Sequence, residues 1–133
     1  MEESPGLTAI RKVLAAHPEI QLALVFGSVA SGGAGPDSDL DVAIAHGRQP
    51  LAPETKRRLI EELASATGRP VDLVDLATAG EPLLGQIIQH GYRLLGSDGD
   101  YAELVIRHLD LKTDFLPYRQ RLLAERRRAW IES

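Results

Sequence analysis

From Ile20 to Ile44 the chain reads IQLALVFGSVASGGAGPDSDLDVAI, in which two apolar runs flank a glycine-rich segment. The first run is short and stops at Gly27, which is typical of a buried strand. The second begins at Leu40 and alternates apolar residues with others, which predicts a half-buried strand of period two. Between them, residues 27–38 contain four glycines and a proline, so we expect a loop rich in accessible backbone.

Outside this stretch, helical and strand patterns continue to alternate. The expected elements are a helix from Leu7 that closes before Pro18, a helix from Pro53 to about Gly68, a strand over Val71–Leu76, a short helix from about Pro82 to His90, a small strand over Tyr92–Leu95 and a long final helix. This alternation indicates an α/β protein with a small sheet flanked by helices.

The final helix carries more apolar residues than one buried face needs. Asp98 or Asp100 is expected to cap it, and Pro117 to kink it. Its main apolar stripe runs from Tyr101 to Leu122 and includes His108, which we expect to be a hydrogen-bonded core residue. A second apolar set lies outside that stripe and predicts a partner-docking surface, together with three arginines at 126–128. This second set consists of Ile106, Leu109, Leu116 and Leu123.

Composition limits the classes of protein that the chain can belong to. Its 133 residues correspond to a single domain spanning 1–133. Cysteine is absent, which excludes thiolate metal sites and a cysteine nucleophile and fits a reducing cytoplasm. The net charge of −4 argues against direct nucleic-acid binding as the main task. No apolar run approaches the roughly 20 residues of a membrane span, and no signal peptide is visible. We therefore expect a cytoplasmic protein that does not bind membranes.

One pattern stands out as chemically informative: Gly27-Ser28, ten further residues, then Asp39-Leu40-Asp41. Glycine at the end of a strand lets backbone amides approach a bulky anion, and Ser28 adds a hydroxyl donor. Asp39 and Asp41 are two residues apart, so on a strand their carboxylates leave the same face. Because paired negative charges are unfavourable unless a cation bridges them, this pattern predicts magnesium beside a polyphosphate.

The next strand offers a third carboxylate from one of two aspartates. Asp72 and Asp75 are three residues apart and point to opposite faces of a regular strand, so only one of them can join the pair. We expect Asp72 to join and Asp75 to be a solvated residue or a turn former, although a bulge would exchange their faces. Three carboxylates beside a phosphate cradle are typical of two-metal nucleotidyl transfer, in which Asp72 also accepts the proton of the attacking hydroxyl.

These motifs resemble those of the minimal nucleotidyltransferase family, which has the DNA polymerase β-like fold: a small mixed sheet flanked by helices, with a long C-terminal helix. The resemblance rests on Gly27-Ser28-x10-Asp39-x-Asp41 and on Val-Asp-Leu-Val-Asp-Leu at 71–76, and it spans nearly the whole chain. The chain length and a C-terminal helix containing Asp-Phe-Leu-Pro-Tyr at 114–118 resemble the MntA-type antitoxins within that family. In contrast to many relatives, residues 29–36 contain neither lysine nor arginine.

The resemblance implies a substrate and a partner. MntA-type antitoxins neutralise HEPN-domain ribonuclease toxins by transferring AMP from ATP to a tyrosine hydroxyl of the toxin. It implies that Gly27 and Ser28 hold the triphosphate of ATP, that Asp39 and Asp41 hold two magnesium ions, and that Asp72 serves the reacting hydroxyl and contributes to the metal site. A hetero-oligomer with the toxin is expected.

Two alternatives remain open on sequence alone. In the first, the site is vestigial and the antitoxin inhibits its toxin by binding alone. In the second, the nucleotide is transferred to a small molecule or to RNA, although such enzymes generally carry an additional substrate domain. Asp98-Gly99-Asp100 repeats the Asp-x-Asp pattern, but it lacks a glycine-serine partner and lies where a helix needs a cap.

Overall fold

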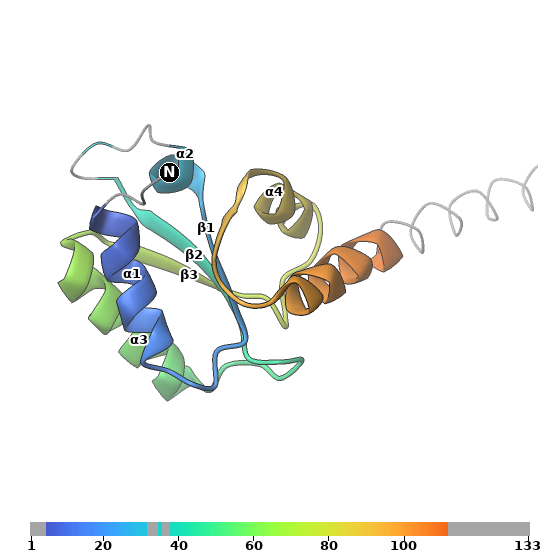
Figure 1. Ribbon diagram of the computed structural model, residues 1–133, viewed down its shortest axis with the longest axis horizontal. Helices are drawn as coiled ribbons and strands as arrows, with labels where there is room; N and C mark the ends of the chain where they lie inside the picture. The colour runs from blue at the N-terminus through green and yellow to red at the C-terminus, as the bar shows by residue number, and fades with distance from the viewer. Residues whose placement is uncertain (1–4, 32–34, 36–37, 112–133) are drawn as a thin grey trace, which may run out of the picture.

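The computed structural model describes residues 5–31, 35 and 38–111, and the structural statements below refer to these residues (Figure 1). Their elements in chain order are α1 (Pro5–Ala15), β1 (Leu22–Phe26), α2 (Gly27–Ser31), β2 (Leu40–Ala45), α3 (Pro53–Thr67), β3 (Val71–Asp75), α4 (Leu83–His90), β4 (Tyr92–Leu95) and a C-terminal helix described over 98–111. Apart from α2, these elements agree with the sequence-based expectation to within a few residues.

The four strands form one mixed sheet in the order β3-β2-β1-β4. β1 lies antiparallel to both β2 and β4, whereas β2 and β3 run parallel. The long connection through α3 permits the parallel pair, because parallel neighbours cannot be joined by a tight turn. The small mixed sheet that the sequence predicted is therefore confirmed.

Helices cover both faces of this sheet (Figure 1). α1 and α3 pack on one face, where the core includes Leu14, Val42 and Leu59. α4 and the C-terminal helix pack on the other, against Leu24 and Ala43. The alternation expected for β2 fails at one position, because Ala43 is as fully buried as Val42 and Ile44. Asp41 and Ala45, near the two ends of β2, are partly exposed.

The boundaries of α3 follow ordinary helix chemistry. Pro53 occupies the first turn, where its missing N–H is no loss. Gly68 ends the helix in the left-handed conformation and donates its N–H to the Ala64 carbonyl. Leu59 and Leu63 form the buried stripe against the sheet. The start at Pro53 and the end near Gly68 agree with the sequence-based prediction.

The first part of the glycine-rich segment is helical, which corrects the expectation of a loop over 27–38. Residues 27–31 form the single turn α2. Val29 and Ala30 pack against the core on the α1 side of the sheet, and this burial explains why the turn forms. The expectation was based on glycine content, but the glycines at 32, 33 and 35 follow α2 rather than lie within it.

The cap of the C-terminal helix also differs from the expectation. Ser97 is the capping residue, because its hydroxyl accepts a hydrogen bond from the Asp100 N–H at 3.1 Å. Asp100 returns the interaction by accepting from the Ser97 N–H at 3.3 Å, so the two form a reciprocal capping box. Asp98 instead pairs with Arg93 at 2.7 Å. The expected kink at Pro117 and the apolar positions beyond Leu111 lie outside the described residues.

His108 is hydrogen-bonded as expected, but it is not a core residue. Its Nδ1 atom contacts Oε1 of Glu81, which precedes α4, and about a fifth of its side chain remains exposed. The contact joins the C-terminal helix to the start of α4.

In the described part of the chain, none of the helices has the length and apolar character needed to span a bilayer.

Candidate functional site

Asp41 and Asp72 are register partners on the parallel strands β2 and β3. Paired positions on neighbouring strands lie about 5 Å apart, and both side chains alternate with residues that face α1 and α3. They therefore leave the sheet on the α4 side. The sequence-based choice of Asp72 over Asp75 as the neighbour of Asp41 agrees with this geometry.

Asp39 lies directly before β2 and is exposed. The peptide groups on both sides of it are held by the segment that precedes β3. The Ser38 carbonyl accepts a hydrogen bond from Arg69 Nη1 at 3.1 Å, and the Leu40 N–H donates to the Pro70 carbonyl at 2.8 Å. Hydrogen bonds on both sides therefore fix the backbone of Asp39.

The three carboxylates influence one another electrostatically. Partial burial raises the pKa of the Asp41 carboxyl above its usual value, and the negative charges of Asp72 and Asp39 raise this pKa further. Like charges held together in this way favour protonation or a bound cation.

Gly27 lies against the Asp41 side chain and has a backbone that favours glycine. Its φ angle is +70°, and a Cβ atom placed there would overlap Asp41 Oδ2 and lie 3.1 Å from Asp41 Cγ. Phe26, the preceding residue, is the register partner of Asp41 on β1. The next residue, Ser28, is half-buried in α2. The structure therefore brings the glycine-serine pair and Asp41 to one end of the sheet.

Asp75 has a different role from Asp72. Its carboxylate accepts hydrogen bonds from the N–H groups of Leu51 at 2.8 Å and Ala77 at 2.9 Å. These bonds close the turn after β3 and tie it to the segment that precedes α3. The interpretation of Asp75 as a turn former is confirmed.

Arg69 was not predicted as a site residue from the sequence. This residue lies between α3 and β3, and its Nη1 atom donates to the Gly35 carbonyl at 2.6 Å as well as to that of Ser38. It brings a positive charge to a segment that has none, since residues 13–47 contain no lysine or arginine. The contact spans more than thirty positions, so local patterns gave no signal for it.

A family comparison supports the chemistry suggested by this geometry. The model of the polymerase β nucleotidyltransferase family matches residues 8–100, which include all five predicted site residues. The chain belongs to this nucleotidyltransferase family. The match confirms the predicted fold and enzyme class, and the mixed sheet with its flanking helices is in keeping with it.

Comparisons with individual proteins are more specific than the family match. The protein adenylyltransferase MntA of Shewanella oneidensis is 31% identical over 111 residues, which are 80% of this chain and 76% of that protein. A crystal structure of a toxin–antitoxin with AMP-PNP contains a chain that is 29% identical, with a TM-score of 0.74, over 90% of this chain and 96% of that one. A structure of the tri-AMPylated Shewanella oneidensis HEPN toxin in complex with an MNT antitoxin contains a chain that is 27% identical. The two chains superpose with a TM-score of 0.69 over 90% of this chain and 94% of that one.

The carboxylates do not by themselves enclose an ion. Within residues 5–31, 35 and 38–111, no group of three or more histidine, aspartate or glutamate side chains is arranged to hold a metal. Magnesium does not require such a group, because it usually binds through one or two carboxylates, several waters and the phosphates of a substrate. The mutual repulsion at Asp41 and the hard oxygen donors of all three aspartates fit magnesium bound together with a nucleotide.

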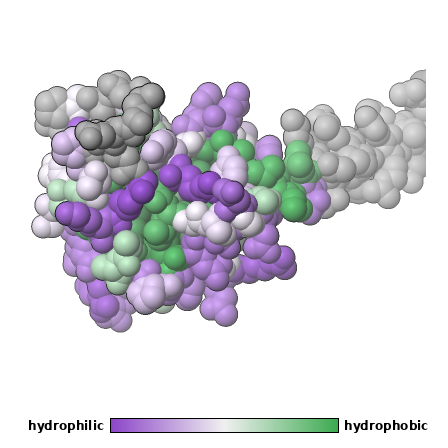
Figure 2. Space-filling view, in the orientation of Figure 1, coloured by the Kyte–Doolittle hydropathy of each residue, from purple (hydrophilic) through white to green (hydrophobic). Residues whose placement is uncertain are grey.

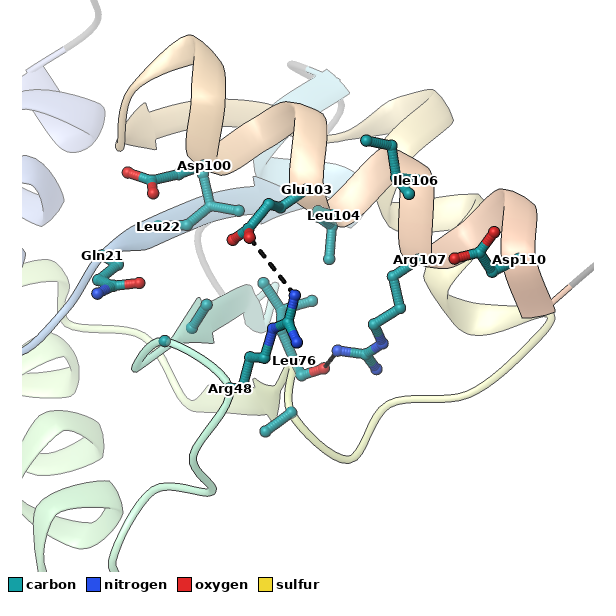
Figure 3. A pocket seen from close by; sticks show the side chains of 13 residues that line it. Gln21, Leu22, Arg48, Leu76, Asp100, Glu103, Leu104, Ile106, Arg107 and Asp110 are labelled. Carbon is teal, nitrogen blue, oxygen red and sulfur yellow. Dashed lines mark hydrogen bonds and ion pairs between the residues drawn. The ribbon is translucent and has the colours of Figure 1, made fainter.

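A separate cavity of about 480 Å³ lies at the other end of the sheet (Figure 3). It is bounded by Leu22, Ala45 and Leu76 and by the C-terminal helix, where Glu103 pairs with Arg48 at 3.6 Å. Ala45 is four residues beyond Asp41 along β2, a separation of roughly 13 Å. None of the predicted site residues lines this cavity.

We predict that Gly27→Ala destabilises the protein more than Gly68→Ala. Both glycines have nearly the same φ, +70° and +68°, but a Cβ on Gly68 would meet nothing within 4 Å. Gly68→Ala should cost about 1–2 kcal/mol from backbone strain alone. Gly27→Ala adds displacement of the Asp41 carboxylate, and combining it with Asp41→Ala should recover the added part. Urea unfolding measures all three variants, and equal costs for the two glycine variants would contradict the close contact.

We also predict that Asp41→Asn stabilises the free protein at neutral pH. Because the pKa of Asp41 is raised by folding, the proton stabilises the folded state below the ordinary value of 3.8, and this stabilisation is lost as the pH rises through the raised pKa. Asparagine mimics the neutral acid, so the unfolding temperature at pH 7 should rise by about 1–3 °C. The difference should vanish in acid.

Asp110→Asn, which removes an exposed carboxylate from the C-terminal helix, is the control for this pH dependence. In calorimetry across the pH range, Asp110→Asn should not raise the unfolding temperature at pH 7 relative to its value in acid as Asp41→Asn does. A lower unfolding temperature for Asp41→Asn at pH 7 would mean that the folded protein stabilises the ionised Asp41, contrary to the prediction.

Proposed function

We propose that this protein is a magnesium-dependent adenylyltransferase that transfers AMP from ATP to a tyrosine hydroxyl of a HEPN-type toxin and thereby neutralises it. The observation that carries the proposal is the close approach of Gly27 to Asp41, with Asp72 as the register partner of Asp41. This arrangement joins a backbone suited to phosphates with carboxylates suited to a divalent cation. The relatives that are described as an adenylyltransferase and as a complex with an AMPylated toxin support it.

In this proposal, Gly27 and Ser28 bind the triphosphate of ATP. Gly27 has no side chain to obstruct the approach of a phosphate, and Ser28 offers a hydroxyl donor. A toxin–antitoxin relative that was crystallised with AMP-PNP supports a nucleoside triphosphate as substrate. ATP as the substrate supports the cytoplasm as the compartment of the reaction.

Asp39, Asp41 and Asp72 would hold magnesium together with the phosphate oxygens. When bound, magnesium neutralises phosphate charge and acidifies the attacking hydroxyl. Asp72 accepts the hydroxyl proton of the tyrosine. The tyrosine oxygen then forms a bond to the α-phosphorus of ATP, and the bond from that phosphorus to pyrophosphate breaks. Asp39 and Asp41 would hold the cation that accompanies the triphosphate, so that pyrophosphate can leave opposite the entering oxygen.

The exposed apolar side chains of the C-terminal helix suit a protein partner. Ile106 is 57% exposed, Leu109 51% and Leu111 40%. Figure 2 shows hydrophobic side chains gathered along this helix on the face in view. Exposed apolar groups of this kind commonly mark a protein interface. Their presence supports the proposed complex with a toxin, and it also favours the alternative that the protein inhibits by binding alone.

We expect the wild-type protein, with ATP and magnesium, to add the mass of AMP to its cognate HEPN toxin. Asp41→Asn should lower the transfer rate at least about a hundredfold, because it removes a carboxylate at the proposed metal site. Asp98→Asn is the matched control, since Asp98 belongs to the other Asp-x-Asp pair and contacts Arg93. Mass spectrometry of the toxin measures both variants. No added mass, or equal labelling by Asp41→Asn, would contradict the proposed enzyme.

The same proteins separate transfer from inhibition by binding. If AMP transfer neutralises the toxin, the ribonuclease activity of the toxin should survive incubation with Asp41→Asn under the same conditions. If Asp41→Asn still abolishes ribonuclease activity without labelling, the protein inhibits by binding alone.

Asp72→Asn and Asp75→Asn should affect different properties of the protein. Removal of the proposed proton acceptor should reduce turnover by about 10²–10⁴-fold with little change in stability. Asp75→Asn loses a carboxylate that accepts two backbone hydrogen bonds, so it should lower the free energy of unfolding by about 1–3 kcal/mol while the folded fraction keeps its turnover. Rates corrected for the folded fraction measure this difference. The opposite result would assign the third carboxylate to Asp75.

A further inference from the structure

The segment that leads into β2 is held by a single arginine from elsewhere in the chain. Arg69 Nη1 donates to two carbonyls, those of Gly35 and Ser38. These two residues also bond to each other, because the Gly35 N–H donates to Ser38 Oγ at 2.9 Å and the Ser38 N–H donates to the Gly35 carbonyl at 3.2 Å. Arg69 therefore bonds to two residues that also bond to each other, shortly before Asp39.

Arg69 is itself held to the end of α3. Its N–H donates to Thr67 Oγ1 at 3.3 Å, and the Thr67 hydroxyl donates to the Leu63 carbonyl at 2.7 Å. Leu63 is fully buried in the core between α3 and the sheet. A continuous chain of hydrogen bonds thus connects a rigid part of the core to the peptide that precedes Asp39.

The residue after Arg69 completes the arrangement. The Pro70 carbonyl accepts from the Leu40 N–H, so residues 69 and 70 bind the peptide groups on both sides of Asp39. The guanidinium also brings positive charge close to the proposed cation site without bonding to the Asp41 or Asp72 carboxylate in the described structure. An arginine so placed restricts where Asp39 can lie and leaves its carboxylate available for a ligand.

We propose that Arg69 is a positioning residue, which fixes Asp39 for binding the divalent cation that accompanies the nucleotide. This inference rests on the proposed function of the same site. Without Arg69, part of the binding energy of the cation must order the segment before β2. The cation concentration needed for nucleotide binding should therefore rise, while nucleotide affinity at saturating cation should change little.

Isothermal titration calorimetry of AMP-PNP binding to the whole chain, repeated at a series of manganese concentrations, tests this inference. Arg69→Met should raise the manganese concentration for half-maximal binding about tenfold, as expected from loss of a charged donor that serves two carbonyls. Arg69→Lys should restore part of the loss, because an ammonium can donate to the same carbonyls but lacks the planar guanidinium.

Arg107→Met is the matched control, since Arg107 also donates to two loop carbonyls, those of Leu76 and Ala79, but near the other end of the sheet. It should lower the unfolding temperature while leaving the manganese requirement unchanged. A wild-type manganese requirement in Arg69→Met would overturn the proposal and leave Arg69 a purely structural residue. If Arg69→Met does not fold, a wild-type manganese requirement in Arg69→Lys, together with faster hydrogen exchange of the Leu40 amide, would overturn it, because the segment would then be loosened without any effect on cation binding.

AMP transfer to the toxin is measured separately on the same proteins. If the wild type binds AMP-PNP with manganese but labels no toxin, the proposed function fails, and the titrations still decide the role of Arg69. Absence of manganese-dependent AMP-PNP binding in the wild type would overturn both proposals.

Discussion

Parallel pairing of β2 with β3 places the Asp41 and Asp72 carboxylates beside each other, and their mutual repulsion has to be offset by the rest of the fold. The opposing energy comes from burial along the same strands. Leu40, Val42 and Ile44 are fully buried under α1 and α3, and each contributes roughly 1.5–3 kcal/mol. A shift of β2 by one residue would turn these side chains away from α1 and α3 and turn Asp41 into the core. The core therefore holds the carboxylates in an arrangement that they would not adopt alone.

The remaining parts of the site depend on this register. β1 pairs with β2 so that Phe26 lies opposite Asp41, and the next residue must then turn sharply against that carboxylate. Gly27 permits the turn because of its positive φ and because it has no Cβ. Val29 and Ala30 pack against the core immediately afterwards and are partly buried, which stabilises α2 beside the site. Sheet pairing, a glycine and a short buried turn thus bring two distant sequence motifs together.

Local patterns predicted the parts of the fold and the site that depend on local chemistry. The apolar runs predicted the strands, Pro53 and Gly68 marked the ends of α3, and the odd spacing of Asp72 and Asp75 separated their roles. The errors arose where burial or long-range bonding decides the structure. Ala43 is buried because helices cover both faces of the sheet, and a period-two pattern contains no information about the second layer. Ser97 caps the C-terminal helix one position before Asp98, the nearer of the two aspartates expected to cap it. Helix ends cannot be predicted from sequence to within one residue.

If the site binds a cation as proposed, the placement of Arg69 affects stability and ligand binding in opposite directions. An arginine bonded directly to Asp41 would relieve the repulsion and lower the pKa of that carboxyl, but it would also occupy the oxygens that a cation needs. In this protein the guanidinium instead bonds to the backbone carbonyls of Gly35 and Ser38, and the pKa of Asp41 remains raised. Positive charge is used to fix the backbone, while the carboxylates keep the unfavourable interaction that a cation and its nucleotide relieve on binding. Repulsion among the carboxylates lowers the stability of the free protein. A cation that neutralises these charges relieves the repulsion, and this relief adds to the affinity for the ligand.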